Sequence, residues 1–187
     1  MKNISKLTLA DLKAMKPRRE VLAFAKSCDG DMQKFWDTCP DGDWLLWLLR
    51  KTGNLNEMDA RRIALAFAKR VLPIFERVNP CDSNPRSCLQ AVERFLKNPT
   101  VVNERAMIAA AYEVHATYTA YAAASAAFHA AFYPHATAAA DYAVYFATSA
   151  ADVIESETPI GSTINADARR KFEQWGANKV RSIIKLK

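Results

Sequence analysis

DTCPDGDWLLWLL (residues 37–49) places a turn directly before a helix. Its first part contains Pro, Gly and Asp, which favour turns, and its second part is apolar on nearly every side. A helix without a polar face has to be buried centrally or covered by a partner. We therefore predict that this helix lies at the heart of the fold and that Trp44 and Trp47 are core residues.

Apolar residues at helical spacing continue along the first half of the chain. They predict helices over residues 9–16, 19–27, 31–38, 44–51, 56–78 and 84–98. Thr8 is expected to cap the first of these, either Asp41 or Asp43 to cap the fourth, and Gly53 to end the fourth. In the longest helix, Pro73 should cause a kink or a break one turn before the end.

Alanine dominates the second half of the chain, over residues 103–133 and 135–155. Alanine has the highest helix propensity, whereas the residue before Pro134 resists helical geometry. We therefore expect two long antiparallel helices joined at Pro134. A final basic helix is predicted over residues 165–185. One face of this helix is expected to carry Phe172, Trp175, Lys179 and Ile183.

Strand-type alternation of apolar and polar residues does not occur over any length of the sequence. The predicted fold class is therefore all-α, a bundle or a stack of helical hairpins with about eight or nine helices, including the two Ala-rich ones. The 187 residues are enough for one domain with a substantial core. Within that domain we distinguish N-terminal helices (1–34), a central part (35–155) and a basic C-terminal helix (163–187).

The charge and apolar pattern is typical of a cytoplasmic protein. The chain has no apolar segment of a secretory signal and no uninterrupted apolar run of about 18 residues, so we expect no membrane association. Lys and Arg exceed Asp and Glu by 26 − 20 = 6. This excess permits an acidic partner, although the same charges also serve solubility.

Residues that could catalyse a reaction or hold a metal are sparse. The sequence has no phosphate-binding loop, dinucleotide fingerprint, zinc-protease helix or nucleophile elbow. His115 and His129 would lie about 21 Å apart along one helix, too far to share a metal, and His135 comes later still. The four cysteines have no CxxC spacing, and we interpret them as structural thiols. We therefore expect no enzyme activity, no metal and no cofactor.

Charged residues on helix surfaces are the candidate contacts with a partner. For a protein partner the candidates lie in the acidic turn, where they also suit helix capping, and on the polar side of the long helix. These residues are Asp41, Asp43, Arg61 and Arg62. For a nucleic-acid partner the candidates lie in the basic C-terminal helix and would contact phosphates. These residues are Arg169, Arg170, Lys179 and Arg181.

Three segments followed by the Ala-rich region carry a resemblance to a known family. They read CPDGDWLLWLLRKTG (39–53), DARRIALAFAKRVLPIFE (59–76) and NPRSCLQAVERFLKNP (84–99). The pattern resembles a family of helical immunity proteins from bacterial polymorphic-toxin loci, and similar chains occur in tailed-phage genomes. The resemblance covers residues 35–155, and the start of the Leu-rich helix at Asp43 and Trp44 is its most specific piece.

This resemblance implies that the chain binds and neutralises a toxin, and it supplies no catalytic residues. The basic net charge of this chain departs from the family pattern, since immunity proteins that block nucleases are usually acidic. This difference argues against a nuclease as the target. We therefore predict a protein-binding module, either an immunity-like protein or a phage counter-defence protein that occludes a toxin or a defence protein. A nucleic-acid-associated accessory protein is the alternative, and an enzyme is the third reading. Close packing of Ala-rich helices between chains further predicts a homodimer that uses part of residues 106–151.

Overall fold

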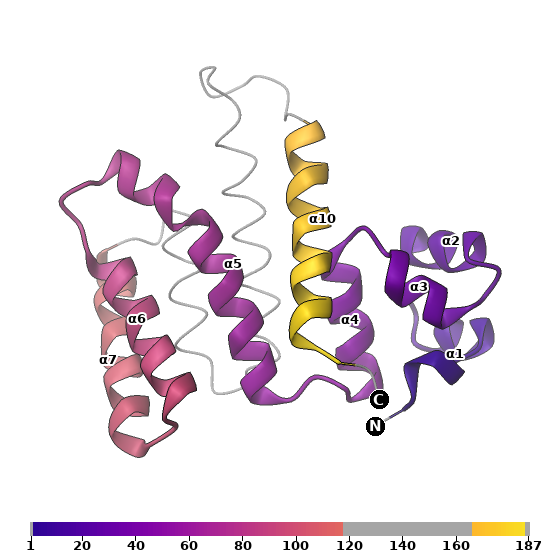
Figure 1. Cartoon of the computed structure of the whole chain (residues 1–187), viewed down its shortest axis with the longest axis horizontal. Coiled ribbons are helices and arrows are strands. Elements are labelled where there is room, and N and C mark those ends of the chain that lie inside the picture. The colour runs from indigo at the N-terminus through magenta and orange to yellow at the C-terminus, as the bar shows by residue number, and fades with distance from the viewer. Residues whose placement is uncertain (1, 118–165, 186–187) are drawn as a thin grey trace. The chain divides into compact units, whose positions relative to one another are not determined.

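The computed structural model describes residues 2–117 and 166–185, and all regular secondary structure in these residues is helical (Figure 1). The elements are η1 (Ile4–Lys6), α1 (Leu9–Ala14), α2 (Arg19–Ser27), α3 (Met32–Thr38), α4 (Gly42–Thr52), α5 (Glu57–Val78), α6 (Asn84–Lys97), α7 (Val101–Thr117) and α10 (Ala166–Ile183). The all-α prediction is confirmed for this part of the chain.

The described helices belong to two compact units. The first unit comprises Met1–Leu55 and Glu173–Lys187, and the second comprises Asn56–Phe172. Helix α10 therefore begins in the second unit and continues into the first.

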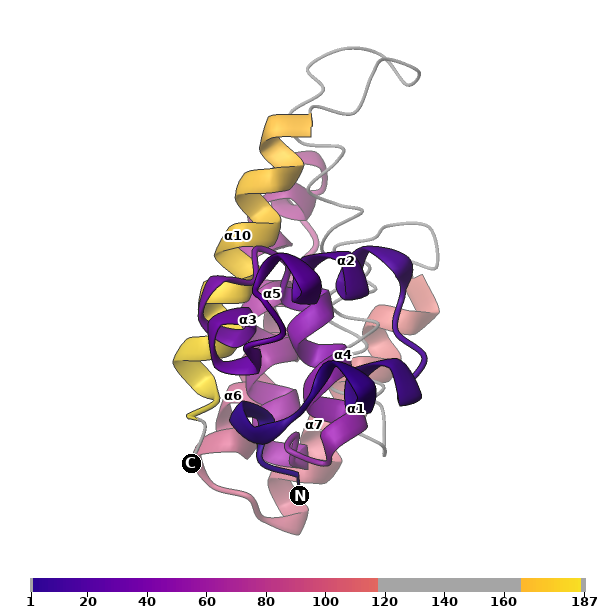
Figure 2. The same ribbon diagram turned by 90° about the vertical axis from the view of Figure 1, so that its right-hand side faces the viewer.

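The first unit begins with short helices that lie next to one another in sequence and in space (Figure 2). Thr8 caps α1 as predicted, since its Oγ1 accepts from the Asp11 amide at 3.1 Å and the Asp11 carboxylate accepts from the Thr8 amide at 2.9 Å. Helix α2 has the predicted bounds, and Asp31 caps α3 by accepting from two backbone amides. Local capping signals therefore place these helices.

Helix α4 is buried through its leucines. Asp41 caps its start, and Gly53, with a φ of 72°, ends it in the left-handed conformation that glycine tolerates. The fully buried side chains are Leu45, Leu46, Leu48 and Leu49. The central position predicted for this helix is thus confirmed by the leucines.

The prediction that Trp44 and Trp47 are core residues is wrong, because both side chains are only partly buried. At 3.6 residues per turn, Trp47 lies opposite the side shared by Leu45 and Leu49. The Trp44 ring contacts Phe24, with centroids 6.0 Å apart. Trp36, in α3, is the buried tryptophan of this unit.

Helix α10 packs on a face one residue away from the predicted one. Phe172 is buried as expected, but Trp175, Lys179 and Ile183 are only partly buried. The buried positions that follow Phe172 are Gly176, Ala177, Val180 and Ile184. The small residues Gly176 and Ala177 face the start of α4, and that close contact sets the rotation of the helix.

The second unit is organised around α5. Buried side chains recur every four residues along it, at Ile63, Phe67, Val71 and Phe75. The helix continues through Pro73 rather than breaking there, and its C-terminal part is bent relative to the rest (Figure 1). Of the two predicted outcomes, a kink or a break, the structure therefore has the kink.

Helices α6 and α7 form an antiparallel hairpin that packs against α5. Phe172 lies in the part of α10 that belongs to this unit. Its ring contacts the Phe67 ring edge-on, with the two ring centroids 5.9 Å apart. Helix α7 covers the beginning of the first Ala-rich helix predicted over residues 103–133. The remainder of that prediction, the second Ala-rich helix over residues 135–155 and the junction at Pro134 lie outside the described residues. None of the described helices combines the length and the apolar character that crossing a membrane requires.

Candidate partner-binding site

The acidic turn before α4 is built by capping. The Asp41 carboxylate accepts from the Asp43 amide at 2.8 Å, so it satisfies one of the amides left open at the helix start. Asp43 accepts from Arg18 Nη1 at 3.0 Å, and both side chains in this ion pair are exposed. Because its side chain is exposed, Asp43 is the member of the turn that a partner can reach. Giving up an exposed ion pair for such a contact would cost little stability.

The carboxyl of Asp41 titrates in an unusual range. Burial, together with the negative charges of Asp43 and Glu173, raises its pKa to about 6, although hydrogen bonds from the backbone amides of Asp43 and Trp44 act to lower it. The folded chain thus holds a proton on Asp41 more tightly than an unfolded chain would.

This shift predicts a pH-dependent stability. The folded pKa of about 6 lies above the ordinary value of 3.8, so the contribution of Asp41 to stability is greatest at low pH and is lost as the pH rises through 6. Asp41→Asn keeps an oxygen that can cap α4 and removes the titration. The unfolding free energy of this variant relative to wild type should therefore increase between about pH 4 and pH 7 in urea titrations. A difference that stays constant over this range would contradict the shifted pKa.

Arg181 of α10 is committed to the fold of the first unit. Its Nη1 donates to the carbonyl oxygens of Trp36 and Cys39, each at 2.9 Å, and its Nη2 donates to Asn178 Oδ1 at 2.8 Å. Carbonyl groups at a helix end have no partner within the helix, and Arg181 satisfies two at the end of α3. This guanidinium therefore positions the turn before α4.

The buried cysteines behave as packing residues. Cys28, Cys39 and Cys88 are buried, whereas Cys81 is exposed. Burial raises the pKa of the Cys39 and Cys88 thiols to about 12, so both remain protonated near neutral pH. A protonated, buried thiol is a poor nucleophile, in keeping with the structural role predicted for these side chains.

Arg61 and Arg62 of α5 have different environments. Arg62 lies at the surface and pairs with Asp59 at 2.6 Å. Arg61 is only 3 % exposed, so the prediction that it lies on the polar side of the helix is wrong. Its Nη2 donates to Glu57 at 3.0 Å, and its guanidinium carbon lies 5.5 Å from the centre of the Phe95 ring. Arg61 therefore joins α5 to α6, and a partner cannot contact it directly.

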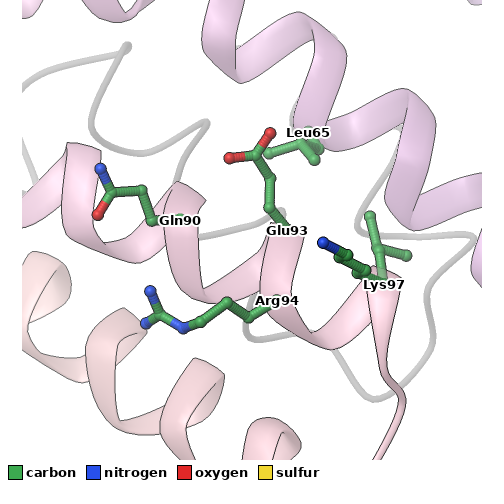
Figure 3. Close-up of a pocket in the computed structure, with 6 residues that line it drawn as sticks. Leu65, Gln90, Glu93, Arg94 and Lys97 are labelled. Carbon is green, nitrogen blue, oxygen red and sulfur yellow. The ribbon is translucent and has the colours of Figure 1, made fainter.

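A hollow of about 530 Å³ lies between α5 and α6 and opens to solvent (Figure 3). It is lined by Leu65 of α5 and by Gln90, Glu93, Arg94, Leu96 and Lys97 of α6. Figure 3 shows the Glu93 side chain reaching toward Leu65. Glu93 also forms an ion pair with Lys69, which links the two helices beside this α5–α6 hollow. The hollow thus combines two leucines with charges of both signs.

The eight residues selected from the sequence do not form one site. Asp41, Asp43, Lys179 and Arg181 belong to the first unit, and Arg61, Arg62, Arg169 and Arg170 belong to the second. Within the basic set, Arg169 and Arg170 are exposed and Lys179 is partly buried. Arg170 also pairs with Asp167 at 3.7 Å.

Sequence reasoning missed the α5–α6 hollow. The sequence feature that could have indicated it is a pair of leucines that lie outside the buried stripes of their helices. Leu65 lies between Ile63 and Phe67, and Leu96 follows Phe95. Such residues leave apolar surface beside charged side chains. The pattern becomes meaningful only when two helices bring their extra leucines to the same hollow.

Among the described residues, no group of three or more His, Cys, Asp or Glu side chains is arranged to hold a metal ion. His129 and His135 lie outside these residues.

Comparisons with protein families, with curated proteins and with solved structures give no match. Function therefore has to be inferred from the residues of this chain.

Proposed function

We propose that this chain is a non-catalytic protein-binding module, an immunity-like or phage counter-defence protein that occludes a toxin or a defence protein. The observation that carries the proposal is the α5–α6 hollow. Its walls come from residues 59–76 and 84–99, the same segments that carry the resemblance to immunity proteins.

The lining of the hollow suits a protein surface. Protein interfaces combine an apolar centre with a polar rim, and here Leu65 and Leu96 accompany Gln90, Arg94 and Lys97. Glu93 is engaged by Lys69, so Arg94 and Lys97 supply the positive charge of the hollow. A partner that presents carboxylates around an apolar side chain complements this arrangement.

A charge reversal in the α5–α6 hollow tests this function. The probe protein is the product of the neighbouring gene. Arg94→Glu with Lys97→Glu should weaken binding about 100-fold, because two attractive contacts become repulsive. The change should also abolish protection when the two proteins are expressed together in bacteria. Calorimetry and growth assays measure these effects.

The matched control is Arg19→Glu with Lys26→Glu, which makes the same charge change at exposed positions of α2. Its affinity and protection should equal those of wild type. Equal loss in both double variants would indicate a non-specific charge effect and contradict a site in the hollow. Wild-type protein that neither binds nor protects would contradict the proposed function with this probe.

The alternative function, a nucleic-acid-associated accessory protein, depends on α10. The exposure of Arg169 and Arg170 favours it, whereas Arg181 holds the end of α3. Fluorescence anisotropy with labelled duplex DNA separates the two functions. Binding that weakens steeply with salt, and less steeply after Arg169→Gln with Arg170→Gln, would support the alternative, because each neutralised phosphate contributes a log–log slope of about −0.9.

A further inference from the structure

Helix α7 exposes an apolar surface. Among the described residues, the large hydrophobic side chains that are exposed all belong to it: Val101 at 63 %, Val102 at 76 % and Tyr112 at 54 %. Single exposed apolar residues are ordinary, but a group of them on one element marks an interaction surface.

The exposed residues share one side of the helix. Met107, Ala111 and Val114 are buried and mark the packed side of α7. At 3.6 residues per turn, the opposite side carries the exposed Val101, Val102, Arg105, Ala109, Tyr112 and Glu113, which we call the outer α7 face. Ala109 lies at the middle of α7 and near the middle of this face.

The charges of the outer α7 face are self-complementary. Arg105 precedes Ala109 by four residues, and Glu113 follows it by four. Within one helix these two side chains are separated by about 12 Å of rise, too far to pair with each other. In an antiparallel pair of α7 helices related by a two-fold axis at Ala109, Arg105 of each copy opposes Glu113 of the other.

We propose that the outer α7 face binds α7 of a second copy of this chain in an antiparallel homodimer centred on Ala109. The small Ala109 side chain lets the two helices approach closely at the axis. The same symmetry places Tyr112 of one copy over the exposed Ala106 of the other, which covers apolar surface on both. The dimer is independent of the function proposed for the α5–α6 hollow.

Sedimentation equilibrium of the purified full chain at tens of micromolar tests the dimer. Wild type should have twice the chain mass of 20.9 kDa. Arg105→Glu alone and Glu113→Arg alone should each weaken the dimer at least about 100-fold and give monomers, because each creates two like-charge contacts across the axis. Combining the two changes exchanges the charges and should restore the dimer.

Glu104→Arg is the matched control, since it makes the same charge change as Glu113→Arg at an exposed residue outside the outer α7 face. This variant should remain a dimer, and all variants should keep the wild-type circular dichroism spectrum. Monomeric wild type would overturn the proposal, whether residues 118–165 of the same chain or a foreign protein cover the face. Failure of the double variant to regain the dimer mass would overturn the antiparallel arrangement.

Discussion

Leu46→Ala should lower the free energy of unfolding by about 2–5 kcal/mol, the range for removing a large aliphatic side chain from a packed core. Leu46 is fully buried in α4, and the surrounding helices cannot close the resulting cavity completely. Trp47→Ala in the same helix should cost less, because the Trp47 side chain is only partly buried. Urea denaturation followed by far-UV circular dichroism compares the two variants.

This pair of variants separates two descriptions of α4. Nearly every side of the helix is apolar in sequence, so apolar character alone predicts that the larger Trp47 side chain matters more. The structure predicts the opposite order, because burial belongs to the side that carries Leu45, Leu46 and Leu49. A greater loss for Trp47→Ala than for Leu46→Ala would contradict the orientation of α4.

Gly42→Ala should lower the free energy of unfolding by about 1–3 kcal/mol, and Gly42→Val by more, because each overfills a packed contact. A Cβ atom at Gly42 would lie 2.9 Å from the carbonyl carbon of Gly176 and 3.1 Å from the amide nitrogen of Ala177. Both are backbone atoms, so they cannot move aside as the end of a flexible side chain does. The start of α4 would have to shift away from α10.

Asp43→Ala is the control for Gly42, since it changes the next residue of the same turn. It removes the exposed ion pair with Arg18, which is expected to contribute no more than about 1 kcal/mol, and it leaves the contact of Gly42 with α10 in place. Thermal melting by differential scanning calorimetry should therefore rank Gly42→Val below Gly42→Ala, and both below Asp43→Ala. Equal melting temperatures for all three would show that α4 and α10 do not meet closely at Gly42.

Neighbouring residues were enough to predict where several helices begin and end. Thr8 caps α1 through Asp11, and Asp41 caps α4 through Asp43, so each interaction spans only two or three residues. Gly53 ends α4 because glycine tolerates its positive φ. Signals of this range depend on neighbours along the chain, and a sequence contains them completely.

The candidate site could be predicted only in part. Residues 59–76 and 84–99 were selected from the sequence, and these segments form the α5–α6 hollow. The sequence did not predict the lining of the hollow, because a hollow depends on how two helices lie against each other. For the same reason it assigned Arg181 to phosphate contact, although this side chain binds two carbonyl groups at the end of α3.

The sequence by itself determined the helical class of the described residues, their main helix boundaries and the caps of α1 and α4. Only the tertiary structure decided which side of each helix is buried: leucines rather than Trp44 and Trp47 in α4, and Arg61 inward on α5. Helix formation follows from propensities and contacts within about four residues. Burial depends on surfaces brought together from distant parts of the chain, as where Gly42 meets Gly176, and a helix that is apolar on nearly every side does not specify which side they will cover.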